Sequence, residues 1–78
     1  MNPTSEEVTR YWKNQGEFYQ QAAELIEKKG EDYAPLVKIN YQNAISAYEN
    51  GKLFKEALGL AIKIDDRNKI QELEEKLK

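Results

Sequence analysis

Carboxylates are the only side chains in this sequence suited to acid–base chemistry. The chain has 78 residues, with no histidine and no cysteine, so it lacks the commonest general base and the thiolate ligands of zinc sites. An acidic cluster, Glu72, Glu74 and Glu75, stands among lysines near the C-terminus. This pattern is typical of a solvated helix surface with pairs of opposite charge. The sequence therefore predicts no catalytic residue, no metal site and no cofactor.

Two further groups of residues have a structural interpretation that we prefer to a chemical one. Asp65 and Asp66 lack the spacing of calcium ligands, and they suit the amino end of a helix, where a carboxylate accepts hydrogen bonds from free amides. The aromatic residues Tyr11, Trp12, Phe18 and Tyr19 lie on one side of a predicted helix. Aromatic rings can stack on nucleic-acid bases, but Arg10 and Lys13 are the only cations nearby, so we expect these rings in the core.

The charge balance argues against a nucleic-acid partner. The chain contains 14 acidic and 12 basic residues, for a net charge of −2, and provides no basic field for phosphates. No run approaches the roughly 20 apolar residues of a membrane span, and the first residues lack the apolar segment of a signal peptide. We therefore expect a soluble, cytoplasmic chain that folds as a single helical domain over residues 1–78.

The apolar periodicity predicts an all-α fold. Residues about three and four apart are apolar, and no segment alternates with the period of a strand. Start and stop signals such as Thr4, Pro35, Gly30 and Gly51 place helices over about residues 5–29, 34–50, 52–64 and 67–77. Short links between them predict antiparallel helical hairpins. We expect a bundle of three main helices plus a short C-terminal helix, with the third helix the most enclosed.

The first helix carries a long apolar stripe with a seven-residue spacing. It comprises Val8, Tyr11, Trp12, Phe18, Tyr19, Ala22, Leu25 and Ile26, and polar Gln15 interrupts it. Gly16, next to Gln15, indicates either a close helix crossing or a bend. The stripe offers more apolar surface than the second and third helices need, so the chain can form a homodimer through helix one.

Two segments of the chain resemble one another. YQQAAELIEKKG at residues 19–30 is echoed by YQNAISAYENG at residues 41–51. Residues 38–71 also resemble a tetratricopeptide repeat, a helical hairpin that stacks into peptide-binding grooves. Ala57 falls on the small residue that opens the family's second helix, and Tyr41, Tyr48 and Phe54 fall on its aromatic positions. The resemblance implies close packing of the hairpin around Ala57.

The same resemblance implies a binding groove beside the second helix. Its partner-binding residues would be Ile39, Gln42, Ser46, Glu49 and Asn50. Ile39 also points away from the expected buried line of Val37, Tyr41 and Tyr48. Gln42 and Ser46 replace the lysine and asparagine that clamp a terminal carboxylate in chaperone-binding members of the family, so an acidic C-terminal tail is not the expected ligand.

A second resemblance, carried by AISAYENGKLFKEAL, is to the microtubule-interacting and trafficking domain, a three-helix bundle that binds helical tails. Three interpretations therefore stay open: a non-enzymatic module that binds a peptide or helix of another protein beside helix two, a bundle that binds helical tails, and a self-associating homodimeric subunit. Each of them predicts protein–protein interaction.

Overall fold

The computed structural model describes residues 2–78 as four α-helices and one short 3₁₀ turn. The helices are α1 (Ser5–Glu27), α2 (Ala34–Asn50), α3 (Phe54–Lys63) and α4 (Arg67–Lys76), and the turn η1 (Glu31–Tyr33) lies between α1 and α2. No strand occurs among these residues. The predicted all-α fold class is therefore confirmed.

Side-chain caps fix the beginnings of α1 and α4. The Thr4 hydroxyl accepts a hydrogen bond of 3.1 Å from the backbone amide of Glu7. The Asp66 carboxylate accepts one of 3.2 Å from the amide of Lys69. Both bonds satisfy an amide that has no partner within its own helix. These are the caps that the sequence predicts.

The two glycines that follow α1 and α2 act in different ways. Gly30 has a φ angle of 113°, which an L side chain rarely adopts. Gly51 has a φ of −88°, and the left-handed residue of that turn is Lys52, with a φ of 59°. A Cβ atom at Gly51 would lie 2.8 Å from Trp12 Cβ. Gly51 is therefore required by the close approach of α1.

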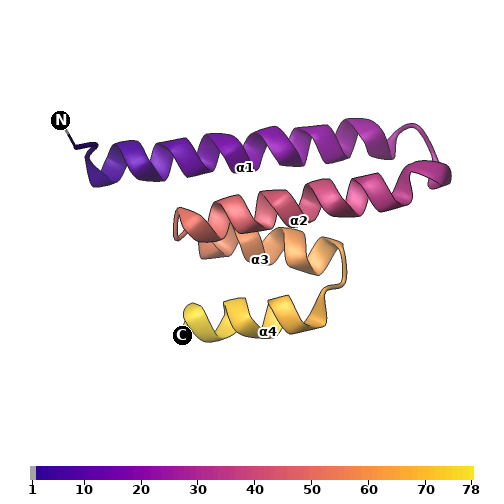
Figure 1. Cartoon of the computed structure of the whole chain (residues 1–78). Coiled ribbons are helices and arrows are strands. Elements are labelled where there is room, and N and C mark those ends of the chain that lie inside the picture. The colour runs from indigo at the N-terminus through magenta and orange to yellow at the C-terminus, as the bar shows by residue number, and fades with distance from the viewer. Residues whose placement is uncertain (1) are drawn as a thin grey trace.

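The helices pack in sequence order as a flat layer (Figure 1). α1 lies along α2, α2 along α3, and α3 along α4, whereas in the described part of the chain the backbone of α1 does not pack against α3 or α4. The principal extents are 45, 29 and 12 Å. The expected bundle is therefore not confirmed, because the helices form an open stack in which backbones pack only between neighbours in sequence. Ion pairs of Glu27 with Lys63 and of Glu49 with Lys69 link helices that are not neighbours.

Helix α2 is central to this stack, and its buried residues face both neighbours. The core contains Ala23, Tyr41, Ala44, Ile45, Tyr48, Ala57, Leu60, Ala61 and Leu73. Ala57 is fully buried, as a close α2–α3 crossing requires. Ile62 on α3 is 58% exposed, so this helix has a wider exposed side than the sequence predicts.

Small residues allow α1 to approach α2 closely. Gly16 is buried, and a Cβ atom added there would lie 2.5 Å from Cε1 of the Tyr48 ring. Ala23, two turns later on α1, is also buried. The Tyr48 hydroxyl reaches past Gly16 and donates a hydrogen bond of 2.9 Å to Gln20 Oε1. Of the two interpretations of Gly16, the close crossing is correct.

Candidate functional site

A row of exposed apolar residues lies on one flank of α1. Val8, Tyr11, Phe18 and Leu25 are between 40% and 65% exposed, and with Gln15 and Ala22 they form a row spaced by three and four residues. Trp12, Gly16, Tyr19 and Ala23 form the neighbouring row, which faces α2. Helix geometry separates the two rows by about a quarter turn. We call the first row the outer flank and the second the inner flank.

The outer flank corrects the prediction for the N-terminal aromatic residues. Trp12 and Tyr19 are partly buried, but Tyr11 and Phe18 are mostly exposed. Each exposed ring meets its neighbour edge to face, with centroids 4.9 Å apart for Tyr11 and Trp12 and 5.4 Å apart for Phe18 and Tyr19. The four rings are therefore divided between core and surface.

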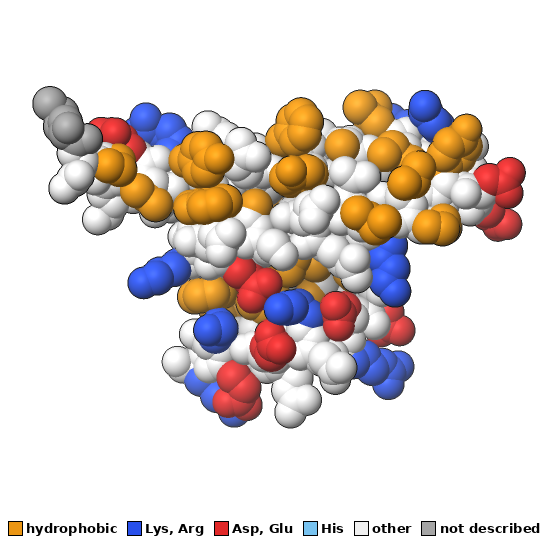
Figure 2. All heavy atoms as spheres, in the orientation of Figure 1, with side chains coloured by type: hydrophobic (Ala, Val, Ile, Leu, Met, Phe, Trp, Pro, Cys, Tyr) orange, Lys and Arg blue, Asp and Glu red, His pale blue; other side chains and the backbone are white. Residues whose placement is uncertain are grey.

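Helix α2 extends the apolar surface of the outer flank. Leu36 and Ile39 are each 50% exposed. Because α1 and α2 are antiparallel right-handed helices, the outer flank and these two residues point to the same side of the layer. Figure 2 shows this face, with hydrophobic side chains over α1 and the adjacent part of α2. We call the six residues Val8, Tyr11, Phe18, Leu25, Leu36 and Ile39 the apolar face.

The five predicted partner-binding residues all lie on α2, but they are not equally available. Ile39, Gln42, Ser46 and Asn50 are exposed. Glu49 is half-buried, because it forms an ion pair with Lys69 of α4. Ile39 therefore joins the apolar face, while Glu49 belongs to a contact within the chain.

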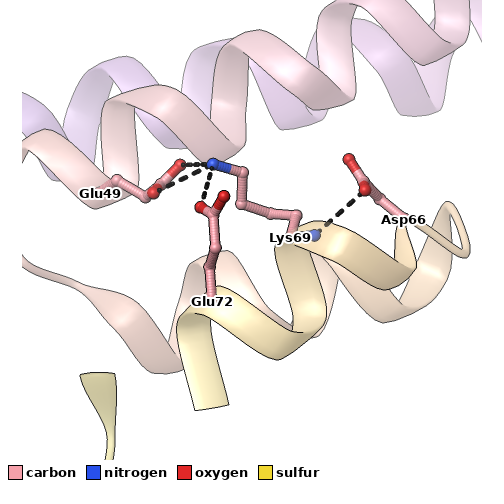
Figure 3. Close-up of polar contacts among 4 residues, drawn as sticks. All are labelled: Glu49, Asp66, Lys69 and Glu72. Atoms are coloured by element: carbon pink, nitrogen blue, oxygen red, sulfur yellow. Dashed lines mark hydrogen bonds and ion pairs between the residues drawn. The ribbon is translucent and has the colours of Figure 1, made fainter. Parts of the chain in front are cut away.

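That contact is a three-residue ionic cluster between α2 and α4 (Figure 3). The Lys69 ammonium lies 3.2 Å from Glu49 Oε1 and 3.0 Å from Glu72 Oε2. The hydrogen bond with Glu72 raises the pKa of Lys69 above its ordinary value, and Glu49 adds to the effect against the opposing cost of burial. Lys69 therefore stays protonated at neutral pH, which makes it an anchor for α4 and not a nucleophile.

A cavity of about 410 Å³ opens where the end of α1 meets α2 and α3. Val37, Tyr41 and Ile64 supply apolar walls, and Glu27 and Lys63 supply charges of opposite sign at its edge. The Lys63 ammonium lies 5.1 Å from the centre of the Tyr41 ring and 3.9 Å from Glu27 Oε1. The charges of Lys63 and Glu27 therefore pair with each other at the edge of the cavity. The cavity lies on the opposite side of α1 from the outer flank.

The described residues contain no cluster of three or more acidic, histidine or cysteine side chains with the geometry of a metal site. Within residues 2–78, no helix combines the length and the apolar character needed to cross a membrane. The acidic residues near the C-terminus are instead exposed, and Glu72 and Glu75 pair with Lys69 and Lys78.

Leu36 belongs to the apolar face but was not predicted from the sequence to be a surface residue. The available signal was its position three residues before Ile39, one turn away on the same side of a helix. Comparisons of the chain with protein-family models, with curated proteins and with solved structures find no match. The proposed function therefore depends on the geometry of this chain alone.

Proposed function

We propose that the chain is a non-enzymatic protein–protein interaction module that binds a helix or peptide on the face formed by α1 and α2. The observation that carries this proposal is the apolar face, with six large apolar residues exposed on one side of a small domain. Their exposed fractions leave about 600 Å² of apolar surface, at the upper end for the largest patch of a monomer. Surfaces of this kind are typical of interaction sites.

The shape of this surface favours a helical partner. Residues of the outer flank recur every three or four positions, which is the spacing that receives the side chains of another helix. Ile39, which the repeat resemblance assigns to a groove beside α2, is exposed next to this row, and Gln42, Ser46 and Asn50 supply exposed polar groups on α2. A partner helix would bury apolar residues against α1 and α2 and keep polar residues toward α4.

Affinity capture with matched variants tests this proposal. Phe18→Glu and Ile39→Glu each place a charge on the apolar face, whereas Ile62→Glu places one on α3, outside that face, at a residue that is 58% exposed. We expect proteins retained by the immobilised wild-type domain and by Ile62→Glu to be lost from the first two variants. Circular dichroism would verify that all three variants remain helical.

Equal retention by all four domains would contradict the proposal, because it would place the binding surface elsewhere. The cavity beside Tyr41 would then become the next candidate. Unfolding of Ile39→Glu alone would show that Ile39 is a core residue and would remove α2 from the proposed surface.

A further inference from the structure

We propose that the apolar face binds a second copy of this chain, so that two α1 helices pack antiparallel in a symmetric homodimer. This inference rests on the proposed function and names the partner. Three observations support it: the sizes of the residues along the outer flank, the charges beside them, and the different lengths of α1 and α2.

The outer flank is complementary to itself in the antiparallel direction. A two-fold axis beside Gly16 and Glu17 places Val8 opposite Leu25 of the second copy, and Gln15 opposite Phe18. The same axis places the large ring of Tyr11 opposite the small side chain of Ala22. None of the six residues of the outer flank, which include Gln15 and Ala22, is charged. The two rows can therefore interlock without burying an unpaired charge.

The residues that border the outer flank provide charge complementarity in the same register. Glu7, Asn14, Gln21 and Lys28 follow at intervals of seven residues, and Lys28 keeps a helical backbone conformation at the end of α1. The antiparallel arrangement brings Glu7 opposite Lys28 of the second copy and Asn14 opposite Gln21. Among the ion pairs of residues 2–78, none involves Glu7 or Lys28.

Two α1 helices packed in parallel would not bring these opposite charges together. It would bring the Glu7 side chains of both copies to one end of the interface and the Lys28 side chains to the other end. Like charges at the same end weaken association, and opposite charges strengthen it. The charges bordering the outer flank therefore favour the antiparallel direction.

The length of α1 explains how the second copy would cover Leu36 and Ile39 in the dimer. α1 has 23 residues and α2 has 17, so α1 is longer by about 9 Å. Trp12 of α1 lies against Gly51, the residue after α2. Residues 5–11 therefore project beyond α2, as Figure 1 shows at the left.

This projecting segment reaches the exposed residues of α2 in the second copy. The contacts of Gly16 with Tyr48 and of Trp12 with Gly51 put Ile39 at the level of Leu25 along the helix pair. Leu25 pairs with Val8 of the second copy, so the projecting turns of each copy lie over Leu36 and Ile39 of the other. Two copies would bury about 1,200 Å², the lower limit for a specific interface.

Sedimentation velocity from low micromolar to high micromolar concentration tests the dimer. We expect wild type and Ile62→Glu to shift from monomer to dimer over this range, and Phe18→Glu to remain a monomer. A wild-type chain that stays monomeric throughout would overturn the proposal. The capture experiment above would still test the proposed function separately, because another protein retained by the apolar face does not require self-association.

Charge substitutions test whether the two α1 helices of the dimer pack antiparallel. Glu7→Lys and Lys28→Glu should each weaken the dimer by about three- to tenfold, because each turns two attractive pairs into repulsive ones. The double variant Glu7→Lys with Lys28→Glu should restore the wild-type dissociation constant. Single variants that leave that constant unchanged would contradict the antiparallel arrangement.

Discussion

The inner and outer flanks of α1 have the same apolar spacing, but the inner flank packs against α2 and the outer flank is exposed. The inner flank combines Trp12 and Tyr19 with Gly16 and Ala23, and these small residues let α1 come close to Tyr48 of α2. The outer flank is nearly as apolar, but its four large side chains stay exposed in the described part of the chain, and Phe18 is 65% exposed. On α1, the apolar row that becomes core is therefore the one whose small residues let another helix approach.

Substitution of the two adjacent aromatic residues gives the largest expected contrast. Tyr19→Ala removes a ring that packs on the core, so it should lower the free energy of unfolding by about 3 kcal/mol. Phe18→Ala removes a mostly exposed ring and should cost the dilute monomer less than about 0.5 kcal/mol. Urea unfolding at low protein concentration measures both. Equal losses would mean that the two flanks are assigned wrongly.

The two glycines inside helices give the next contrast. Gly16→Ala brings a methyl group against the Tyr48 ring and should destabilise the fold by about 2 kcal/mol. Gly59→Ala is the matched control, because nothing lies within 4 Å of a Cβ atom at that position. It should stabilise α3 by about 0.5 to 1 kcal/mol, the usual advantage of alanine over glycine in a helix. A stabilised Gly16→Ala variant would contradict the close crossing.

A smaller effect concerns stability at alkaline pH. Burial raises the pKa of Tyr48 above 10.0, with Glu17 adding to the effect, and the contact with Glu72 raises the pKa of Lys69 above 10.5. The folded state thus holds both protons more strongly than the unfolded state does. The free energy of unfolding should be constant with respect to these groups below about pH 10 and fall above it.

Tyr48→Phe separates the two contributions to this pH dependence. The variant loses the hydrogen bond to Gln20, which lowers stability by about 1 kcal/mol at neutral pH. It also loses the titrating hydroxyl, so its stability should fall less steeply than that of wild type above pH 10. Urea unfolding at pH 8, 10 and 11 measures the slopes. Identical slopes would show that Tyr48 does not contribute.

The local features of the fold could be predicted from the sequence, because each depends on a few neighbouring residues. The seven-residue spacing predicted a helix around Gly16, and the hydroxyl of Thr4 and the carboxylate of Asp66 predicted its start and that of the last helix. The φ angle of Gly30 follows from the same local rules. Exposure of Ile39 was predicted by its position opposite the buried line of α2.

Features that depend on distant residues could not be predicted in this way. Both flanks of α1 have the same spacing, so the sequence alone did not distinguish core from surface for Phe18 and Tyr19. Lys69 lies twenty residues from Glu49, and no local pattern indicates that they pair. Whether the backbones of α1 and α3 pack together depends on helix crossing angles, which explains why a bundle was expected where an open stack is found.

The antiparallel contact between two outer flanks can be measured directly by disulfide cross-linking, because the chain has no cysteine of its own. Val8→Cys and Leu25→Cys would be purified separately with different tags, mixed, and oxidised. We predict that the mixed disulfide forms in several-fold excess over either disulfide between identical variants, because position 8 faces position 25 of the second copy. A predominance of disulfides between identical variants would contradict the antiparallel direction. A yield of the mixed disulfide no higher than random pairing gives, or no product at all, would contradict the interface itself.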